Sequence, residues 1–180
     1  FDGLAIAECG EEIMQHQQQY PVIFLSFADV KQDNYSDAIY KIKKIIANVY
    51  QQFYEIGRSE ALTEVQRRQF MKVTADMDDV TAQSALQDLS YFCYLYYGRK
   101  AIVLLDEYDT PMQEAYIHDY WDKFTSFVRG LFNSTFKTNP YLERALMTGI
   151  TRISKASIFS DLNNLVVITT TSERYAECFG

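Results

Sequence analysis

The stretch that decides the fold is residues 101–109, Ala-Ile-Val-Leu-Leu-Asp-Glu-Tyr-Asp, an apolar run that stops at a group of carboxylates. Uncharged residues with branched side chains are typical of a strand that is buried on both faces of a parallel sheet. In open α/β sheets the ligand site lies outside the carboxyl ends of the strands. We therefore expect Asp106 and Glu107 to lie at a ligand-binding edge.

This pair of acids has the pattern of a Walker B strand, in which the first acid supports Mg²⁺ and the second orients the water that attacks a γ-phosphate. The alternative is a buried strand whose exit carries solvated acids that cap the next helix. Thr110, Pro111 and Gln113 have the pattern of a helix start with Thr110 as N-cap and a capping box. Capping explains Asp109 or Thr110 without requiring the pair before them. Short apolar runs that end in acids are common, so both interpretations stay open at this point.

Composition limits the classes of protein that fit. The chain has 180 residues, 48% of them hydrophobic, with 14 Tyr and 12 Phe, which indicates one globular domain or part of one. A net charge of −7 argues against a general nucleic-acid surface. No apolar run approaches the ~20 residues needed to span a bilayer, and no basic segment followed by an apolar core opens the chain, so we expect a cytoplasmic protein. Three widely spaced cysteines indicate reduced thiols.

Three further apolar runs predict strands that alternate with helices. They are Val22 to Phe27, Leu142 to Ile150 and Val166 to Thr170. Propensity alone would allow a helix at Leu142 to Ile150, but the helical patterns on either side of the acidic strand favour a βαβ arrangement. We expect helices from about Asn34 to Gly57, from Ser59 to about Val73, from Thr81 to Gly98 and from about Asp119 to Phe132. The pattern predicts an α/β fold with a mostly parallel sheet.

The order of these segments resembles the predicted AAA-ATPase-like family of bacterial proteins. The most specific segments are Leu105 to Pro111 and Thr148 to Asn164, while Phe1 to Leu4 and Tyr20 to Val22 match looser positions. The resemblance covers essentially the whole chain. It implies a P-loop NTPase module, often followed in the same polypeptide by a nuclease-like domain of the PD-(D/E)XK type. Residues 1–180 would then form a single partial domain with a three-layer, P-loop NTPase-like (ASCE) sheet and flanking helices.

One departure from the family pattern is decisive. No G-x-x-x-x-G-K-[ST] occurs anywhere in the sequence. The resemblance places the phosphate-binding loop and the first strand upstream of Phe1, so we expect the domain to be truncated before them. In related P-loop ATPases that strand lies between the third strand and the last, so Val166 to Thr170 should face a vacancy, be covered by other residues or be displaced. Without the loop there is no backbone cradle and no Lys for the phosphates, so the chain alone should be inactive and should not bind ATP tightly.

The resemblance also implies roles for individual residues. Asp106 matches the acid on the Mg²⁺ side, and Glu107 matches the acid that activates water. Thr148 or Thr151, at the exit of the next strand, matches the polar sensor between the Walker B acids and the γ-phosphate. ATP and Mg²⁺ are the cofactors that follow from these roles in the intact protein.

Two basic residues complete the candidate set. Arg152 would contact the phosphate or serve a neighbouring subunit of a homo-oligomer as a finger; a surface residue in a basic turn is the equal alternative. Lys155 is a weaker candidate for nucleotide binding. The implied partners are ATP and an attached C-terminal nuclease-like domain, with neither a membrane nor direct nucleic-acid binding by this segment.

Three functions compete on this sequence. The first is an ATP-hydrolysing regulatory module that controls an attached domain or assembly. The second is a metal-dependent nuclease centred on Asp106 and Glu107, which would need a Lys shortly after the second acid on an adjoining strand; the residues after Glu107 are Tyr-Asp-Thr-Pro instead. The third is a non-catalytic interaction module that has kept the fold without the chemistry.

Overall fold

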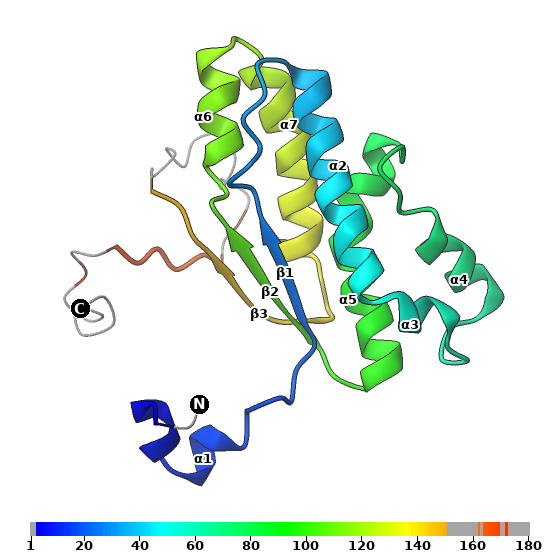
Figure 1. The fold of residues 1–180 in the computed structure, drawn as a ribbon, viewed down its shortest axis with the longest axis vertical. Helices are drawn as coiled ribbons and strands as arrows, with labels where there is room; N and C mark the ends of the chain where they lie inside the picture. Colours follow the sequence, from blue (N-terminus) through cyan, green and yellow to red (C-terminus); the bar gives the residue numbers. More distant parts are fainter. Residues whose placement is uncertain (1–2, 151–161, 163, 170–171, 173–180) are drawn as a thin grey trace.

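A parallel sheet forms the centre of the computed structural model, which describes residues 3–150, 162, 164–169 and 172. The three strands pair in the order β1-β2-β3 (Figure 1). Their bounds are β1, Val22–Ser26; β2, Ala101–Asp106; and β3, Leu142–Met147. Both pairings are parallel, which confirms the predicted α/β class and the mostly parallel sheet.

Helices fill the two connections between parallel strands, as βαβ crossovers require. The β1–β2 connection contains α2 (Tyr35–Gln52), α3 (Tyr54–Arg58), α4 (Glu64–Met71) and α5 (Asp79–Tyr97). The β2–β3 connection contains α6 (Thr110–Ile117), α7 (Trp121–Phe132) and a π-helical turn, η2 (Asn133–Lys137). A 3₁₀ turn, η1 (Ala5–Glu8), and a short helix, α1 (Glu11–Met14), precede β1. No helix in the ranges that the structure describes is long and apolar enough to cross a membrane.

One face of the sheet is packed against helices and carries the core. Ile23, Leu25, Val103 and Leu105 point to this face and are at most 2% exposed. Helices α2, α5 and α7 pack against one another beside it (Figure 1). Burial of these branched side chains is the main favourable term in the stability of the sheet.

The opposite face of the sheet, here called the outer face, is open. Its residues are Val22, Phe24, Ile102, Leu104, Arg144 and Leu146, which the register places side by side. Phe24 is 53% exposed and Leu146 is 58% exposed. The prediction of strands buried on both faces is therefore wrong for these residues, because the described helices cover the other face only. The second helical layer of a three-layer fold is not seen in the described part of the chain.

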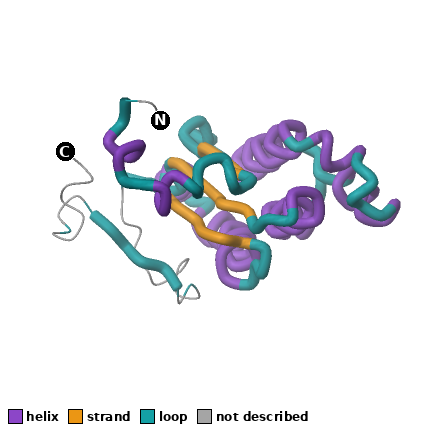
Figure 2. Tube along the Cα trace, turned by 90° about the horizontal axis from the view of Figure 1, so that it is seen from below, coloured by secondary structure: helices purple, strands orange, loops and turns teal. Residues whose placement is uncertain are grey.

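The third strand lies at the edge of the sheet, and the predicted fourth strand is not formed. β3 pairs with β2 on one side only within the described residues. Residues 165–169 carry no regular secondary structure and lie apart from the three strands (Figure 2). Val166 is 74% exposed. The β-branched pattern predicted a strand there, but a strand needs a paired neighbour, and in this structure the edge of β3 does not provide one to residues 165–169.

Capping side chains mark the starts of α2, α4 and α5. Asn34 accepts a hydrogen bond from the Asp37 backbone N–H at 3.0 Å, which confirms the predicted start of α2. The helix after α3 is capped by Thr63, with a complete capping box to Gln66, rather than by Ser59 as predicted. Asp78 rather than Thr81 caps α5, and its carboxylate accepts from the Thr81 N–H at 2.8 Å.

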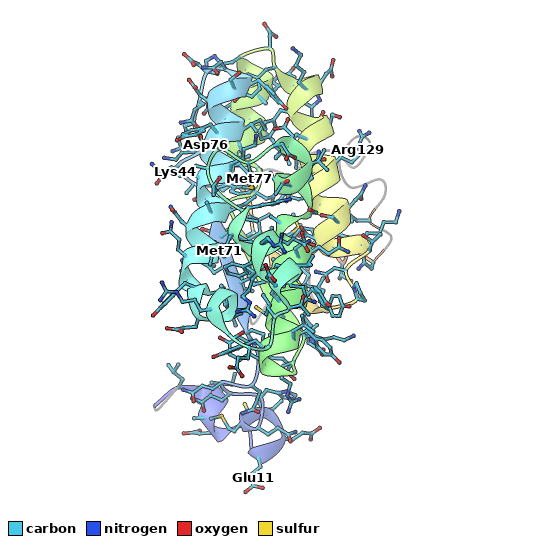
Figure 3. The ribbon with its side chains drawn as sticks, turned by 90° about the vertical axis from the view of Figure 1, so that its right-hand side faces the viewer. Glu11, Lys44, Met71, Asp76, Met77 and Arg129 are labelled. Atoms are coloured by element: carbon cyan, nitrogen blue, oxygen red, sulfur yellow. The ribbon has the colours of Figure 1, made fainter. Side chains whose placement is uncertain are left out.

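Of the two glycines predicted to end helices, Gly98 does so and Gly57 does not. Gly98 ends α5 in the left-handed conformation, as predicted. The helix that was expected to reach Gly57 ends instead at Gln52, and Gly57 lies inside α3. A Cβ on Gly57 would lie 2.8 Å from Cδ1 of Phe70, so this glycine allows α4 to pack closely on α3. Figure 3 looks onto this side of the molecule, where Met71 marks the end of α4.

Candidate functional site

The exits of β2 and β3 meet at one edge of the sheet. Asp106 ends β2, and Thr148 follows the last residue of β3. The Thr148 hydroxyl donates to Oδ1 of Asp106 at 2.6 Å, and the Thr148 backbone N–H donates to the Leu105 carbonyl at 2.9 Å. The next turn is fixed as well, because the Tyr108 N–H donates to the Thr148 carbonyl at 3.1 Å. Two residues predicted for the same site are therefore in direct contact.

A hydroxyl from the first strand completes the environment of Asp106. Ser26 is the register partner of Asp106, and its Oγ donates to Oδ2 of the carboxylate at 3.1 Å. Each carboxylate oxygen therefore accepts one hydroxyl, one from each neighbouring strand, which fixes the plane of the carboxylate. Sequence analysis did not single out Ser26. A polar residue at the end of the apolar run from Val22 was the available signal.

Glu107 adopts an uncommon backbone conformation for a residue with a side chain. Its φ is 50°, in the left-handed region. Its N–H faces the Thr148 hydroxyl at 3.3 Å, and its Oε2 accepts from the Thr110 hydroxyl at 2.9 Å. Such a conformation costs on the order of 1 kcal/mol and persists where the surroundings hold it. The chain therefore turns sharply between the two acids, and Glu107 is held from two sides.

Asp109 is a buried carboxylate that sequence analysis considered only as a cap. It is 1% exposed and occupies the N-cap position of α6, where its Oδ2 accepts from the Gln113 side chain at 3.1 Å. The prediction that Thr110 is the N-cap and that Gln113 closes a capping box is wrong. Thr110 is the first helical residue, and its hydroxyl is bound to Glu107.

The carboxylate of Asp109 also limits what can follow β3. A Cβ on Gly149 would lie 2.6 Å from Oδ1 of Asp109 and 2.8 Å from Cε1 of Tyr108. Contacts under about 3 Å require the neighbour to move, and Asp109 is buried at the start of a helix. Gly149 is therefore needed for close approach of the β3 exit to the β2 exit. In the sequence, the signal for this close approach was Gly149, which follows Thr148 at the end of a predicted strand.

The side-chain atoms at this edge that could act as metal ligands are all oxygens. Asp106 supplies a carboxylate, with the hydroxyls of Ser26 and Thr148 on either side. Mg²⁺ prefers oxygen ligands and keeps several waters, so it is usually bound through one or two carboxylates and substrate phosphates. No group of three His, Cys, Asp or Glu side chains that could hold a metal ion occurs in the described residues. The residues fit a supporting role toward phosphate-bound Mg²⁺ rather than a metal cage made by protein alone.

The remaining predicted site residues are Thr151, Arg152 and Lys155, and all three lie outside the described residues. Among the predicted residues, the structure brings together Asp106, Glu107 and Thr148 at the exits of adjacent parallel strands.

Residues 1–159 match the sequence profile of the family AAA-ATPase_like, described as "Predicted AAA-ATPase". This chain belongs to the AAA-ATPase-like family. A relative of the AAA-ATPase-like chain is the "Uncharacterized protein in vnfD 5′ region" of Azotobacter chroococcum mcd 1, 30% identical over 82 residues. The match covers 45% of this chain and only 16% of the length of that relative. No solved structure matches the AAA-ATPase-like chain.

Proposed function

We propose that this chain supplies the Mg²⁺-side acid and the water-orienting acid of an ATP-hydrolysing module. The observation that carries the proposal is the 2.6 Å hydrogen bond from Thr148 to Asp106, which joins the candidate sensor to the candidate Mg²⁺-side acid at the exits of adjacent parallel strands. A capping role for the acids does not require this bond. Membership of the AAA-ATPase-like family supports the same chemistry.

The residues have distinct roles in this proposal. Mg²⁺, when bound with ATP, would offset negative charge on the phosphates. Asp106 would hold waters on the metal side, with its carboxylate plane fixed by Ser26 and Thr148. Glu107 would accept a hydrogen bond from the attacking water through Oε1, while Oε2 stays bound to Thr110. Thr148 would contact the γ-phosphate and, through its hydrogen bond to Asp106, couple the presence of that phosphate to the position of the β2 exit.

The phosphate cradle must come from a segment other than residues 1–180, which contain no G-x-x-x-x-G-K-[ST]. The open edge of β3 and the apolar outer face suit a further strand and helix. We propose that they complete a P-loop NTPase-like (ASCE) sheet, of which residues 1–180 form one partial domain. Arg152, Thr151 and Lys155 would then contact the nucleotide, with Arg152 acting in its own subunit or toward a neighbouring one. A regulatory role toward an attached nuclease-like domain is part of the same proposal.

The test compares Asp106→Asn with Asp119→Asn, at an exposed acid after the end of α6, in the full-length protein. The ATPase rate is measured as Mg²⁺ concentration is varied. We expect Asp106→Asn to raise the Mg²⁺ concentration needed for half-maximal rate and to lower the maximal rate, because the amide offers less negative charge to the metal side. Asp119→Asn should match the unmodified protein. An unchanged Mg²⁺ dependence in Asp106→Asn would reject the assignment of this acid.

Residues 1–180 alone provide a second check by calorimetric titration with Mg²⁺-ATP. We expect no tight binding, since phosphate affinity in this fold comes largely from the loop and the helix terminus behind it. Submicromolar affinity would show that the nucleotide site lies elsewhere in the chain.

A further inference from the structure

Helices α3 and α4 form an excursion within the β1–β2 connection. Figure 1 shows them on the side of the helical layer away from the sheet, so they do not form the edge that carries Asp106. Among the described elements, α4 packs mainly on α3, and α3 also contacts α5. Only Phe70 of α4 is buried, and its ring packs against Tyr50 and Phe92 at centroid distances of 4.8 and 5.6 Å. The other residues of α4 are exposed or half-buried.

A groove lies along this excursion, with a cavity volume of about 570 Å³. We call it the α3–α4 groove. Its lining residues are Gly57, Glu64, Arg67, Arg68, Met71 and Lys72. Gly57 is buried against the Phe70 ring, so the accessible lining is made by side chains of α4 and by Lys72 at its end. Met71 is 57% exposed and provides a flexible apolar contact.

The charge of the α3–α4 groove is opposite to that of the protein. It contains three cations, and Glu64 is the single acid in its lining. Glu64 pairs with Arg68 at 3.0 Å, and both side chains are largely exposed, so the pair holds little energy. Within the described part of the chain, Arg67 and Lys72 have no ion-pair partner. The whole protein has a net charge of −7, so this groove is a positive site on an acidic protein.

We propose that the α3–α4 groove binds an acidic peptide segment of a partner protein, with an apolar side chain of the peptide against Met71. Arginine donates in pairs to carboxylates, and unpaired cations beside an exposed apolar side chain match a segment that combines Glu or Asp with one Leu or Phe. The charge complementarity gives both attraction and orientation. This proposal is independent of the ATPase proposal, because it uses none of the same residues.

A nucleic acid fits the groove less well than a peptide does. Phosphate-backbone binding relies on a long track of cations and on a favourable overall field. Here two of the three cations lie in one short helix and the third follows its last residue, and the net charge of −7 repels a polyanion at longer range. The apolar contact at Met71 also favours a peptide side chain.

The test measures fluorescence anisotropy of a fluorescein-labelled peptide that carries several glutamates around one leucine and one phenylalanine. The controls are the same peptide with glutamine for glutamate, polyglutamate, and a labelled single-stranded oligonucleotide. The protein variant is Arg67→Glu with Lys72→Glu. Its matched control is Arg99→Glu with Lys100→Glu, which makes the same change of charge at another exposed pair.

We expect the unmodified protein to bind the acidic peptide more tightly than any of the three control ligands. The groove variant should lose affinity by at least about tenfold, because like charges are placed against the ligand, and the control pair should lose far less. Met71→Gln should lower the affinity for the acidic peptide but leave the affinity for polyglutamate unchanged. Circular dichroism checks folding, and Arg67→Gln with Lys72→Gln replaces the charge reversal if the latter does not fold.

Three results would overturn the proposal. The first is no binding of the acidic peptide by the unmodified protein. The second is an equal loss in the groove variant and the control pair, which would reduce the effect to overall charge. The third is tighter binding of the oligonucleotide that is lost in the groove variant, which would assign the groove to nucleic acid instead.

Discussion

Oδ1 of Asp106 and Oγ1 of Thr148 are 2.6 Å apart although 42 residues separate them in the chain. The bond crosses from the central strand to the edge strand just where both leave the sheet. Since the next turn is also tied to Thr148 through the Tyr108 N–H, a shift of the β3 exit must move the turn that carries Glu107. This pair is thus the link between the candidate sensor and the candidate acids.

Replacing Thr148 tests that link. Thr148→Val keeps the shape of the side chain and removes the hydroxyl, so Asp106 loses one of its two hydroxyl donors. We expect the proposed ATP turnover of the full-length protein to fall about tenfold to a hundredfold, the effect of losing one hydrogen bond to a charged group. Thr148→Ser should retain most of the rate. Equal rates for the Val and Ser variants would show that the hydroxyl has no part in turnover.

The close approach of Gly149 to Asp109 predicts a coupled effect on stability. Gly149→Ala should lower the free energy of unfolding by about 1–3 kcal/mol, because the new Cβ overlaps the buried carboxylate. In an Asp109→Ala background the same substitution should cost less, since one of the two overlapping groups is gone. Urea titration of the four proteins gives the coupling energy. If the two losses in free energy of unfolding simply add, Gly149 and Asp109 are not in steric contact.

The two faces of β1 should respond differently to truncation. In residues 1–180, Ile23→Ala should cost about 2–5 kcal/mol, because Ile23 is fully buried. Phe24→Ala should cost under about 1 kcal/mol, because its ring is 53% exposed. If the outer face is covered in the full-length protein, Phe24→Ala should become clearly more destabilising there. The same small cost in both proteins would argue against a covering layer.

Burial of Cys93 predicts loss of stability in alkali. Removal from water raises the pKa of this thiol to about 12, whereas an unfolded thiol has a pKa of about 8.5. Stability from this group is full below the unfolded pKa and falls as pH rises toward 12, by up to about 1.4 kcal/mol per pH unit. Urea titrations between pH 7.5 and 10 should show a flatter dependence for Cys93→Ala. Cys9→Ala, at an exposed thiol, should keep the original slope.

The elements that could be predicted are those that local pattern determines. The run ending at Asp106 and the run from Val22 to Phe27 predicted the parallel pair, because apolar length and polar exits are visible in the sequence. The exposure of Leu146 was not predictable, because burial of a strand depends on what packs beside it. The lack of pairing at residues 165–169 agrees with the displacement that the resemblance allowed for this segment. Periodicity marks the strand but does not show its neighbours.

The site shows the same division. Asp106 and Glu107 were predicted from the acidic end of the strand, and Thr148, as an alternative to Thr151, from the resemblance to the family; the structure brings Asp106, Glu107 and Thr148 together. Ser26 was missed, because the strand register that places it against Asp106 is a tertiary property. Caps at Thr63 and Asp78 were displaced by a few residues from those predicted, since several nearby side chains could serve and geometry selects one.

The central claim is that Glu107 orients the attacking water, and Glu107→Gln in the full-length protein tests it most directly. The amide keeps the size of the side chain and the contact to Thr110, while the carboxylate charge that polarises the water is lost. Steady-state ATPase turnover is measured beside equilibrium nucleotide affinity. We expect affinity to stay nearly unchanged and turnover to fall by about 10²–10⁴, because the interaction is made mainly in the transition state. Turnover equal to that of the unmodified protein would contradict the claim and favour a non-catalytic interaction module.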